Sequence, residues 1–520
     1  MLSKIAKRLS NNRNRNTQSK SNQEQPILTM STGVNDNIQC IQQLLGSPTD
    51  LISRTFHIGS KRHLCAIVCI AGLVDKNIIN DQLLKNMLLN IPESSIRLPD
   101  SAEELITLLQ TDILSIHNIS RINTMYDVVL AVLGGDTALF VDGTDQVLII
   151  SSKGWKSRAI EEPQSEALIR GPRDGFTEDI RTNTVLIRRR LRDPNLRFHS
   201  ERIGRRAQKE VIITYIEGIV HPDLVKEVKR RMKTIDMDDS EGAGYIEQWI
   251  ADSFLSPFPL ILNTERPDKV STALLQGKVA ILVDGTPFSL ILPITLVSAF
   301  QSPEDYYSHW LISTLIRILR MIAAFISTFL PALYIALVEY HHGMIPSKLA
   351  FSIAGTREGV PFPAVVEAIM MEVTLEILRE AGIRLPKPIG QTIGIVGGLV
   401  IGEAAVAAGI VSPIMVIVVS LTAITSFVLP TYSFSMAFRI IRFLVMIAAA
   451  FLGLYGVIFA YIMINIHIVN LKSFGIPYSS PFAPNFMNDW KDMILRAPVT
   501  MLDKRPQMLQ PVDKERQTKE

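Results

Sequence analysis

Cysteine is scarce in this sequence. The 520 residues include three cysteines: Cys40, Cys65 and Cys69. Cys65 and Cys69 are four positions apart inside an apolar run (CAIVCIAG) and do not form a CxxC pair. This number and spacing provide neither a disulfide framework nor a structural zinc site. We therefore expect the polar part of the chain to face a reducing, cytosolic compartment.

Net charge and catalytic motifs are also scarce. The 53 basic and 50 acidic residues leave a formal charge of +3, which indicates no particular class of partner. A P-loop, a GxGxxG after a strand, HExxH and GxSxG are all missing from the polar half. We therefore expect no enzymatic activity, no cofactor and no bound metal. The basic N-terminus lacks the apolar stretch of about 7–15 residues typical of a secretory signal, and residues 1–34 are predicted to form a disordered tail.

The charges that are present are unevenly distributed. Mean hydropathy is positive, at +0.23, although 20% of the residues are charged. Two long stretches hold almost none of these charges: Ile389–Phe438 contains Glu403 alone, and Phe443–Leu471 contains none. Uncharged apolar segments of about 18 residues or more are candidates for membrane spans. A purely soluble protein is excluded, and so is a transporter that fills the whole chain, because roughly the first 300 residues are polar enough to be soluble.

The polar half contains an internal repeat. DVVLAVLGGDTALFVDGT at Asp127–Thr144 aligns without gaps to KVSTALLQGKVAILVDGT at Lys269–Thr286, at an offset of 142. A second pair, IAGLV from Ile70 and IEGIV from Ile216, has an offset of 146. Two landmarks in the same order at nearly equal spacing indicate a duplicated module. We predict two α/β subdomains, residues 35–165 and 210–303.

Each copy has the same predicted elements. An apolar strand comes first, a helix follows, and two strands joined by an Asp-Gly turn close the copy. The expected segments are Leu64–Ile70, Asn77–Leu89 and the turn Asp142-Gly143 in the first copy, and Val211–Ile216, Pro222–Met232 and Asp284-Gly285 in the second. An Asp-Gly pair between β-rich runs favours a hairpin turn that needs positive φ, and we prefer this interpretation to a metal or phosphate site.

An arginine-rich region, residues 166–209, separates the copies. We predict a connector helix that Thr177 caps and that Pro194 follows, with arginines near its C-terminal end. Three interpretations are open: a solvated connector, a subunit interface, or a surface for anionic lipid or nucleic acid. Few aromatic residues accompany the arginines, so we expect no nucleic acid. The candidates for an assembly interface are Arg181, Arg188, Arg189 and Arg190.

Long motifs from this region onward resemble a known family. They are GPRDGFTEDIRTNTVLIRRRL after Arg170, TERPDKV, VAILVDGTPF, REGVPFPAVVEAIMMEVTLEILREAGIRLPKPIGQTIGIVGGLVIGEAAVAAGIVSPIMVIVV and a late RAP. Together they resemble the A subunit of the GerA-type bacterial spore germinant (nutrient) receptors, from about Glu166 to Pro498. The family also includes a stand-alone sporulation paralogue, and no residue separates the two.

The resemblance implies a function. It implies a multi-pass subunit of the inner spore membrane with a cytosolic N-terminal half, which forms a homo-oligomer among membrane lipid. It also implies a nutrient-gated channel for monovalent cations that triggers germination together with a transporter-like, germinant-binding B subunit and a C subunit that is a lipoprotein. The alternative from a different class is a non-conducting membrane scaffold.

Residues 304–470 are predicted to form a helical membrane domain, followed by a tail at 471–520. Five apolar segments are expected: Leu311–Val338, Ala364–Leu378, Ile389–Ala408, Pro413–Leu429 and Phe443–Ile466. If all of them cross, the positive-inside rule places the charged tail outside the cell, whereas a re-entrant segment changes the parity. Both possibilities are open.

The second apolar segment is unusually acidic. Glu372, Glu376 and Glu380 fall within about 80° of one another on a helical wheel. Carboxylates at membrane depth favour water, a pore or a basic partner, and a ring of them attracts cations. Local pairing, for instance of Glu376 with Arg379, is the alternative. Glu403 is a further candidate because it is the one charge in its stretch.

The third apolar segment carries a stripe of small residues. Glycine recurs every four positions, at Gly390, Gly394, Gly398 and Gly402. Such a stripe lets helices approach closely, so we predict a helix-packing role for these glycines.

Overall fold

The computed structural model describes residues 30–59, 62–90, 98–99, 101–114, 116, 118–154, 162–163, 165–166, 168–384, 400–493 and 495–517. The chain divides into two compact units, residues 1–155 and residues 156–520, and each is treated by itself. We call the α/β part of the first unit module 1 (residues 30–154) and that of the second module 2 (residues 168–299).

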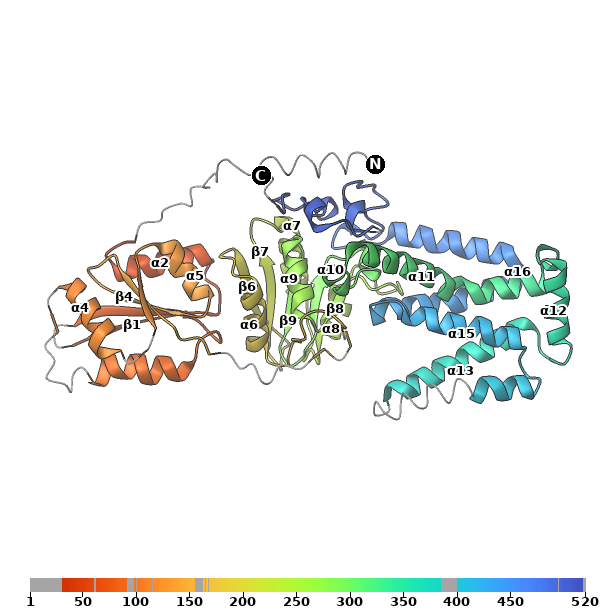
Figure 1. Ribbon diagram of the computed structural model, residues 1–520, viewed down its shortest axis with the longest axis horizontal. Coiled ribbons are helices and arrows are strands. Elements are labelled where there is room, and N and C mark those ends of the chain that lie inside the picture. The colour runs from red at the N-terminus through yellow and green to blue at the C-terminus, as the bar shows by residue number, and fades with distance from the viewer. Residues whose placement is uncertain are drawn as a thin grey trace. The chain divides into compact units, whose positions relative to one another are not determined.

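Module 1 is built on a five-stranded sheet in which every neighbouring pair is antiparallel, in the order β1-β2-β4-β5-β3. The strands are β1 (Leu51–Ile58), β2 (His63–Ile70), β3 (Ile119–Ile122), β4 (Thr137–Val141) and β5 (Val147–Ile150). The helices are α2 (Val34–Leu45), the π-helical η1 (Ile78–Leu84), η2 (Asn86–Asn90) and η3 (Leu109–Ile113), α4 (Ala102–Leu108) and α5 (Met125–Leu133). Helices cover both faces of this sheet (Figure 1), which explains why β2 reads as a continuous apolar run.

Module 2 repeats this arrangement, with the strand order β6-β7-β9-β10-β8. Its strands are β6 (Leu196–Ile203), β7 (Lys209–Ile216), β8 (Leu262–Thr264), β9 (Val279–Val283) and β10 (Ser289–Leu292). Its helices are α6 (Ile180–Arg190), α7 (Pro222–Met232), α8 (Ala243–Ile250) and α9 (Pro267–Leu275). The predicted duplication is confirmed, because the strands occur in the same order along the chain and across the sheet.

The same asparagine fixes the start of the first helix in each module. In module 1 the side chain of Asn37 accepts a hydrogen bond from the amide of Ser31 at 2.9 Å and donates to the carbonyl of Ser31 at 2.6 Å. Asn183 makes the equivalent pair with Thr177, at 2.8 and 2.6 Å. Both asparagine side chains are buried, so their own polar groups need these partners, and each asparagine closes a tight loop before its helix.

The Asp-Gly turns have a second role that the sequence did not indicate. Gly143 and Gly285 have φ values of 92° and 80°, as the turn prediction requires. In addition, the Asp142 carboxylate accepts the amide of Val34 at 3.2 Å, and Asp284 accepts that of Ile180 at 3.3 Å. Each turn therefore docks the N-terminus of the first helix of its own module.

The predicted arginine-rich connector is an integral part of module 2. It supplies α6, the counterpart of α2, and β6, the counterpart of β1. Asp179 caps α6 by accepting the amides of Arg181 and Thr182, both at 3.1 Å, so the predicted cap at Thr177 is wrong by two residues. Leu191 follows the last helical residue, and the chain then enters β6.

The C-terminal half of the second unit is helical. After η4 (Leu296–Ala299) and α10 (Glu304–Tyr307), its helices are α11 (Trp310–Glu339), η5 (His342–Met344), α12 (Ser347–Arg357), α13 (Ala364–Arg384), α15 (Pro413–Phe427) and α16 (Tyr432–Asn470), with residues 400–407 also helical. Among the described residues, α11 and α16 are long and apolar enough to cross a membrane.

Helix α16 reverses direction in the middle. The ring of Phe258 contacts Phe438 edge-on and stacks against His467, with centroid distances of 5.8 and 6.2 Å. A straight helix would separate those two residues by about 40 Å at 1.5 Å per residue. The break is at Gly453, whose φ of 56° and ψ of −135° are not helical. The segment predicted at Phe443–Ile466 is therefore not one continuous span, because the chain turns back within it.

The reversal brings the C-terminal segment (residues 471–517) back to module 2. It contains the short strands β11 (Lys472–Ser473) and β12 (Ile476–Pro477) and the turns η6 (Asp489–Asp492), η7 (Val499–Met501) and η8 (Gln507–Leu509). The amide of Leu296 donates to the Tyr478 carbonyl at 2.8 Å, and that of Val512 donates to Ile219 at 3.0 Å. The tail therefore lies on the same side of the helices as module 2.

Candidate functional site

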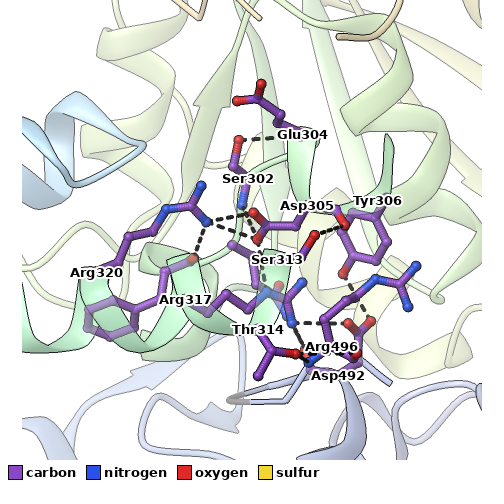
Figure 2. Close-up of polar contacts among 12 residues, drawn as sticks. Ser302, Glu304, Asp305, Tyr306, Ser313, Thr314, Arg317, Arg320, Asp492 and Arg496 are labelled. Atoms are coloured by element: carbon purple, nitrogen blue, oxygen red, sulfur yellow. Dashed lines mark hydrogen bonds and ion pairs between the residues drawn. The ribbon is translucent and has the colours of Figure 1, made fainter. Parts of the chain in front are cut away.

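A buried ion cluster joins α10, which follows module 2, to the first membrane helix. Asp305 lies on α10, and the guanidinium groups of Arg317 and Arg320 on α11 reach its carboxylate at 2.8 Å each. Asp305 also accepts the amide of Ser302 at 3.2 Å. All of these side chains are buried, as Figure 2 shows. Two guanidinium groups around one carboxylate leave one buried positive charge without a counter-charge, so a second acid is expected nearby.

The C-terminal segment supplies that second acid. Asp492 contacts Arg317 through its carboxylate at 3.1 Å and its carbonyl at 2.7 Å, and it accepts the hydroxyl of Tyr306 at 2.9 Å. Arg496 lies over the Tyr306 ring at 4.6 Å from its centroid. We call Asp305, Tyr306, Arg317, Arg320 and Asp492 the junction (Figure 2). It ties α10, α11 and the C-terminal segment together, so movement of any one of them acts on the other two.

The acidic helix α13 is paired mainly with arginines of α16. Glu372 is 3% exposed and lies 2.5 Å from Arg442. Glu376 contacts Arg439 at 2.5 Å and Arg379 on its own helix at 3.0 Å. Local pairing, which was one of the two interpretations for Glu376, is thus present in this structure, and Glu372 is enclosed within the chain.

The remaining predicted acids are more open. The side chain of Glu376 is 42% exposed and that of Glu380 is 59% exposed, although Glu380 lies 2.7 Å from Arg384. Glu403 is exposed in the helical residues 400–407. Glu367 was not predicted: it is buried, pairs with Arg357 at 3.0 Å and accepts the amide of Ser412 at 2.8 Å.

One glycine of the predicted packing stripe can be placed. Gly402 is buried, and a Cβ there would lie 3.5 Å from a methyl carbon of Val416. This is ordinary contact distance, so α15 passes close to this glycine. Gly390, Gly394 and Gly398 lie outside the described residues, and their packing role stays a prediction.

The four arginines predicted for an assembly interface have different environments. Arg188 is buried beneath the surface of module 2, with its guanidinium 4.8 Å from the centroid of the Phe198 ring. Arg181 pairs with Glu210 at 2.9 Å, and Arg190 pairs with Asp174 at 2.6 Å. Arg189 is exposed. An interface role therefore stays a prediction for Arg181, Arg189 and Arg190, whereas Arg188 packs inside the module.

The junction was missed because its members are far apart in the sequence. Arg317 and Arg320 fall within the predicted apolar segment Leu311–Val338, but Asp492 is 175 residues away from Arg317. The available signal was the two arginines inside this segment together with Asp305 just before it, since charges of both signs in such a position need partners.

Comparison with known proteins agrees with this architecture. Residues 39–508 match the family described as the Bacillus/Clostridium GerA spore germination protein. The spore germination protein GerLA of Bacillus cereus is 51% identical over 91% of this chain and 95% of its own. The spore germination protein KA of Bacillus subtilis is 43% identical over 96% of this chain and 90% of its own.

A solved structure is also similar to part of the chain. It is the N-terminal domain of the A subunit of the Bacillus megaterium spore germinant receptor GerK3, 35% identical, covering 51% of this chain and 97% of that one with a TM-score of 0.41. The family match spans most of the sequence, and the two relatives are similar over nearly their full lengths. The chain therefore belongs to the GerA family of spore germination proteins, the A subunits of germinant receptors.

Proposed function

We propose that this A subunit forms a homo-oligomer in the inner spore membrane and that the oligomer is a nutrient-gated channel for monovalent cations. The main observation in support is that Glu376 and Glu380 remain about half exposed on α13, an otherwise largely apolar helix. At membrane depth such carboxylates face water or a neighbouring subunit. Repeated by cyclic symmetry, each becomes a ring that attracts cations.

Unsatisfied atoms beside these acids support the same proposal. Among the described residues, the Glu372 Oε1, Arg439 Nε and Arg442 Nη2 atoms are buried without a hydrogen-bond partner. Buried polar atoms normally have partners, because an unmet one costs about 1–3 kcal/mol. Because these atoms are enclosed within the chain, water held inside the helical domain is the partner that can reach them.

The outer surfaces of the helices also favour assembly in a membrane. Phe451 and Tyr455, on either side of the reversal in α16, are 78% and 75% exposed. Large exposed apolar patches mark contact with lipid or protein. A handful of helices from one chain cannot enclose a hydrated pore, whereas several copies around an axis can.

Partners and gating are part of the proposal. By its family, the chain acts with a transporter-like, germinant-binding B subunit and a C subunit that is a lipoprotein. The junction supports gating, because its buried ion pairs link the first membrane helix to α10. On α10, the hydroxyl of Tyr307 in turn donates to Asp268 of module 2 at 3.1 Å. A displacement of module 2 is thereby transmitted to α11.

Potassium flux tests the proposal. Glu376→Gln and Glu380→Gln, in spores that carry the otherwise intact receptor, should each slow potassium release in response to a mixture of amino acids, sugars and nucleosides. Glu358→Gln is the matched control, because Glu358 is an exposed acid at the end of α12. Unchanged release with both acids replaced, together with purified oligomers that carry no current in planar bilayers, would instead establish the non-conducting scaffold.

A further inference from the structure

Module 2 contains a cavity against the C-terminal segment. Two adjoining hollows, of about 600 and 740 Å³ including space open to solvent, lie between α9, the η4–α10 region and residues 481–516. The residues common to both are Thr272, Gln276, Lys278, Ser298 and Gln301. They form one continuous site with a common wall.

Lys278 is an unusual member of that wall. It is 7% exposed, yet among the described residues its ammonium group has neither an ion pair nor a hydrogen bond. A buried ammonium without a counter-charge is strongly unfavourable, and such groups are normally paired. The position therefore needs an anion that the chain itself does not provide.

Module 1 shows which residues occupy the equivalent positions of the repeat. The repeat aligns Lys278 with Asp136 and Thr295 with Lys153. In module 1 these two residues form an ion pair at 3.3 Å. Module 2 has a cation in place of the acid and a neutral residue in place of its partner, which leaves one positive charge facing the cavity.

The acids of the cavity do not neutralise Lys278. Asp489 accepts the amides of Gln507 and Met508 at 2.9 Å each. Asp492 belongs to the junction, and Asp268 pairs with Arg266 at 3.0 Å. The charged neighbour that acts on Lys278 is a second cation, Lys269, and together with burial it lowers the pKa of Lys278 to about 8.

We propose that this cavity binds a small molecule through an oxyanion, a carboxylate or a phosphate group, for which Lys278 is the counter-charge. Gln276 and Ser298 complete the site, since neither side chain has a hydrogen bond elsewhere in the described part of the chain. Lys504 and Arg516 stand exposed at the opening and add positive charge that attracts the ligand.

The site shares two residues with the junction. Tyr306 lines one hollow and Asp492 the other, and the two are hydrogen-bonded to each other (Figure 2). A bound anion thus contacts the segments that hold the start of α11. Binding itself does not depend on whether the oligomer conducts ions.

Thermal unfolding of the full-length chain in detergent tests the proposal. Sodium phosphate and sodium acetate are compared separately with sodium chloride at equal ionic strength. At least one of the two should raise Tm, as a ligand of the folded state does. Lys278→Met should raise Tm without added anion and weaken the anion effect by at least about tenfold in affinity, the consequence of losing a charged hydrogen bond.

Thr295→Asp is a second variant in case Lys278→Met does not fold. It places an acid at the position equivalent to Lys153, so that the ion pair of module 1 forms with its two charges exchanged, and it should abolish the anion effect by competition. Lys226→Met, at an exposed lysine on α7, is the matched control and should keep the full effect.

A second readout is the acetylation of Lys278 by acetic anhydride, followed by mass spectrometry. The effective anion should protect Lys278 but not Lys226. A response to phosphate alone identifies a phosphorylated ligand, and a response to acetate alone identifies a carboxylate. Absence of any response, or equal Tm shifts in wild type and Lys278→Met, would overturn the proposal.

Discussion

The two α/β modules have one scaffold but different surroundings. Both dock their first helix with a buried asparagine and an Asp-Gly turn, and both have the same strand order. In module 1 the charges at these positions pair with each other, as Asp136 and Lys153 do. Module 2 leaves Lys278 unpaired, and it is followed by the junction of α10, α11 and the C-terminal segment. The positions that the two modules share maintain the fold. The positions that differ serve contacts of module 2 with the rest of the chain or with a ligand.

The junction is the largest difference between the surroundings of the two modules, and Arg317→Ala should remove most of it. This change leaves Asp305 and Asp492 with fewer partners in a buried site, which typically costs about 3–5 kcal/mol. Thermal unfolding in detergent measures the loss. Arg181→Ala, which breaks a half-exposed pair with Glu210, is the control and should cost about 0–1 kcal/mol. Equal effects of the two changes would show that the junction does not stabilise the chain.

The pH dependence of stability sharpens the comparison at Asp136 and Lys278. The folded pKa of Lys278, about 8, lies below its ordinary value of 10.5. Between these two values the unfolded chain binds more protons than the folded one, so stability should rise with pH, by up to about 3 kcal/mol. The rise should be complete above pH 10.5 and absent below pH 8. Tm profiles of wild type and Lys278→Met measure it, and identical profiles would contradict the assignment.

The shared asparagines should have matched effects. Asn37→Ala and Asn183→Ala each remove two hydrogen bonds to half-buried backbone groups, of Ser31 and Thr177 respectively, at a cost of about 1–3 kcal/mol. Hydrogen exchange gives a local measurement. Asn37→Ala should lower protection in β2 but not in β7, and Asn183→Ala should do the reverse. A loss in both strands from either change would show that the modules do not open independently.

The two turn glycines test the comparison with the smallest expected effect. Alanine at Gly143 or Gly285 must adopt a positive φ, which costs about 1–2 kcal/mol. A Cβ at Gly143 would also lie 3.3 Å from Cβ of Ala102, whereas at Gly285 no described atom lies within 4 Å. Hydrogen exchange of β4 and β9 should therefore show a larger loss for Gly143→Ala. A larger loss for Gly285→Ala would show that the contact with Ala102 does not determine the cost of an alanine at the turn.

The duplication could be predicted because its most similar parts, the strands on either side of each Asp-Gly turn, are also the most buried. The first helix and strand of module 2 could not be, because arginines obscure the likeness between α6 and α2. The offset of 146 that relates Ile70 to Ile216 also relates Asn37 to Asn183, and this would have extended the repeat.

The membrane half was less predictable. Hydropathy located α11 and α15, but the reversal at Gly453 lies in a long uncharged run, where an isolated glycine gives little signal. The partners of Glu372 and Glu376 come mainly from α16, and periodicity on one helix does not show which neighbour it faces. Such sites are formed by contacts between distant segments, and the residue pattern of a single helix contains no information about those contacts.

The return of the C-terminal segment has a consequence for biosynthesis. In module 2 the amide of Ile294 donates to the hydroxyl oxygen of Ser473, and the amide of Leu296 donates to the carbonyl of Tyr478. Both acceptor residues are translated after every membrane helix. Module 1 can fold as soon as it leaves the ribosome, but module 2 is finished only when the last helix has been inserted and has turned back. A chain that fails to insert therefore exposes an incomplete module 2, which distinguishes it from a correctly assembled subunit.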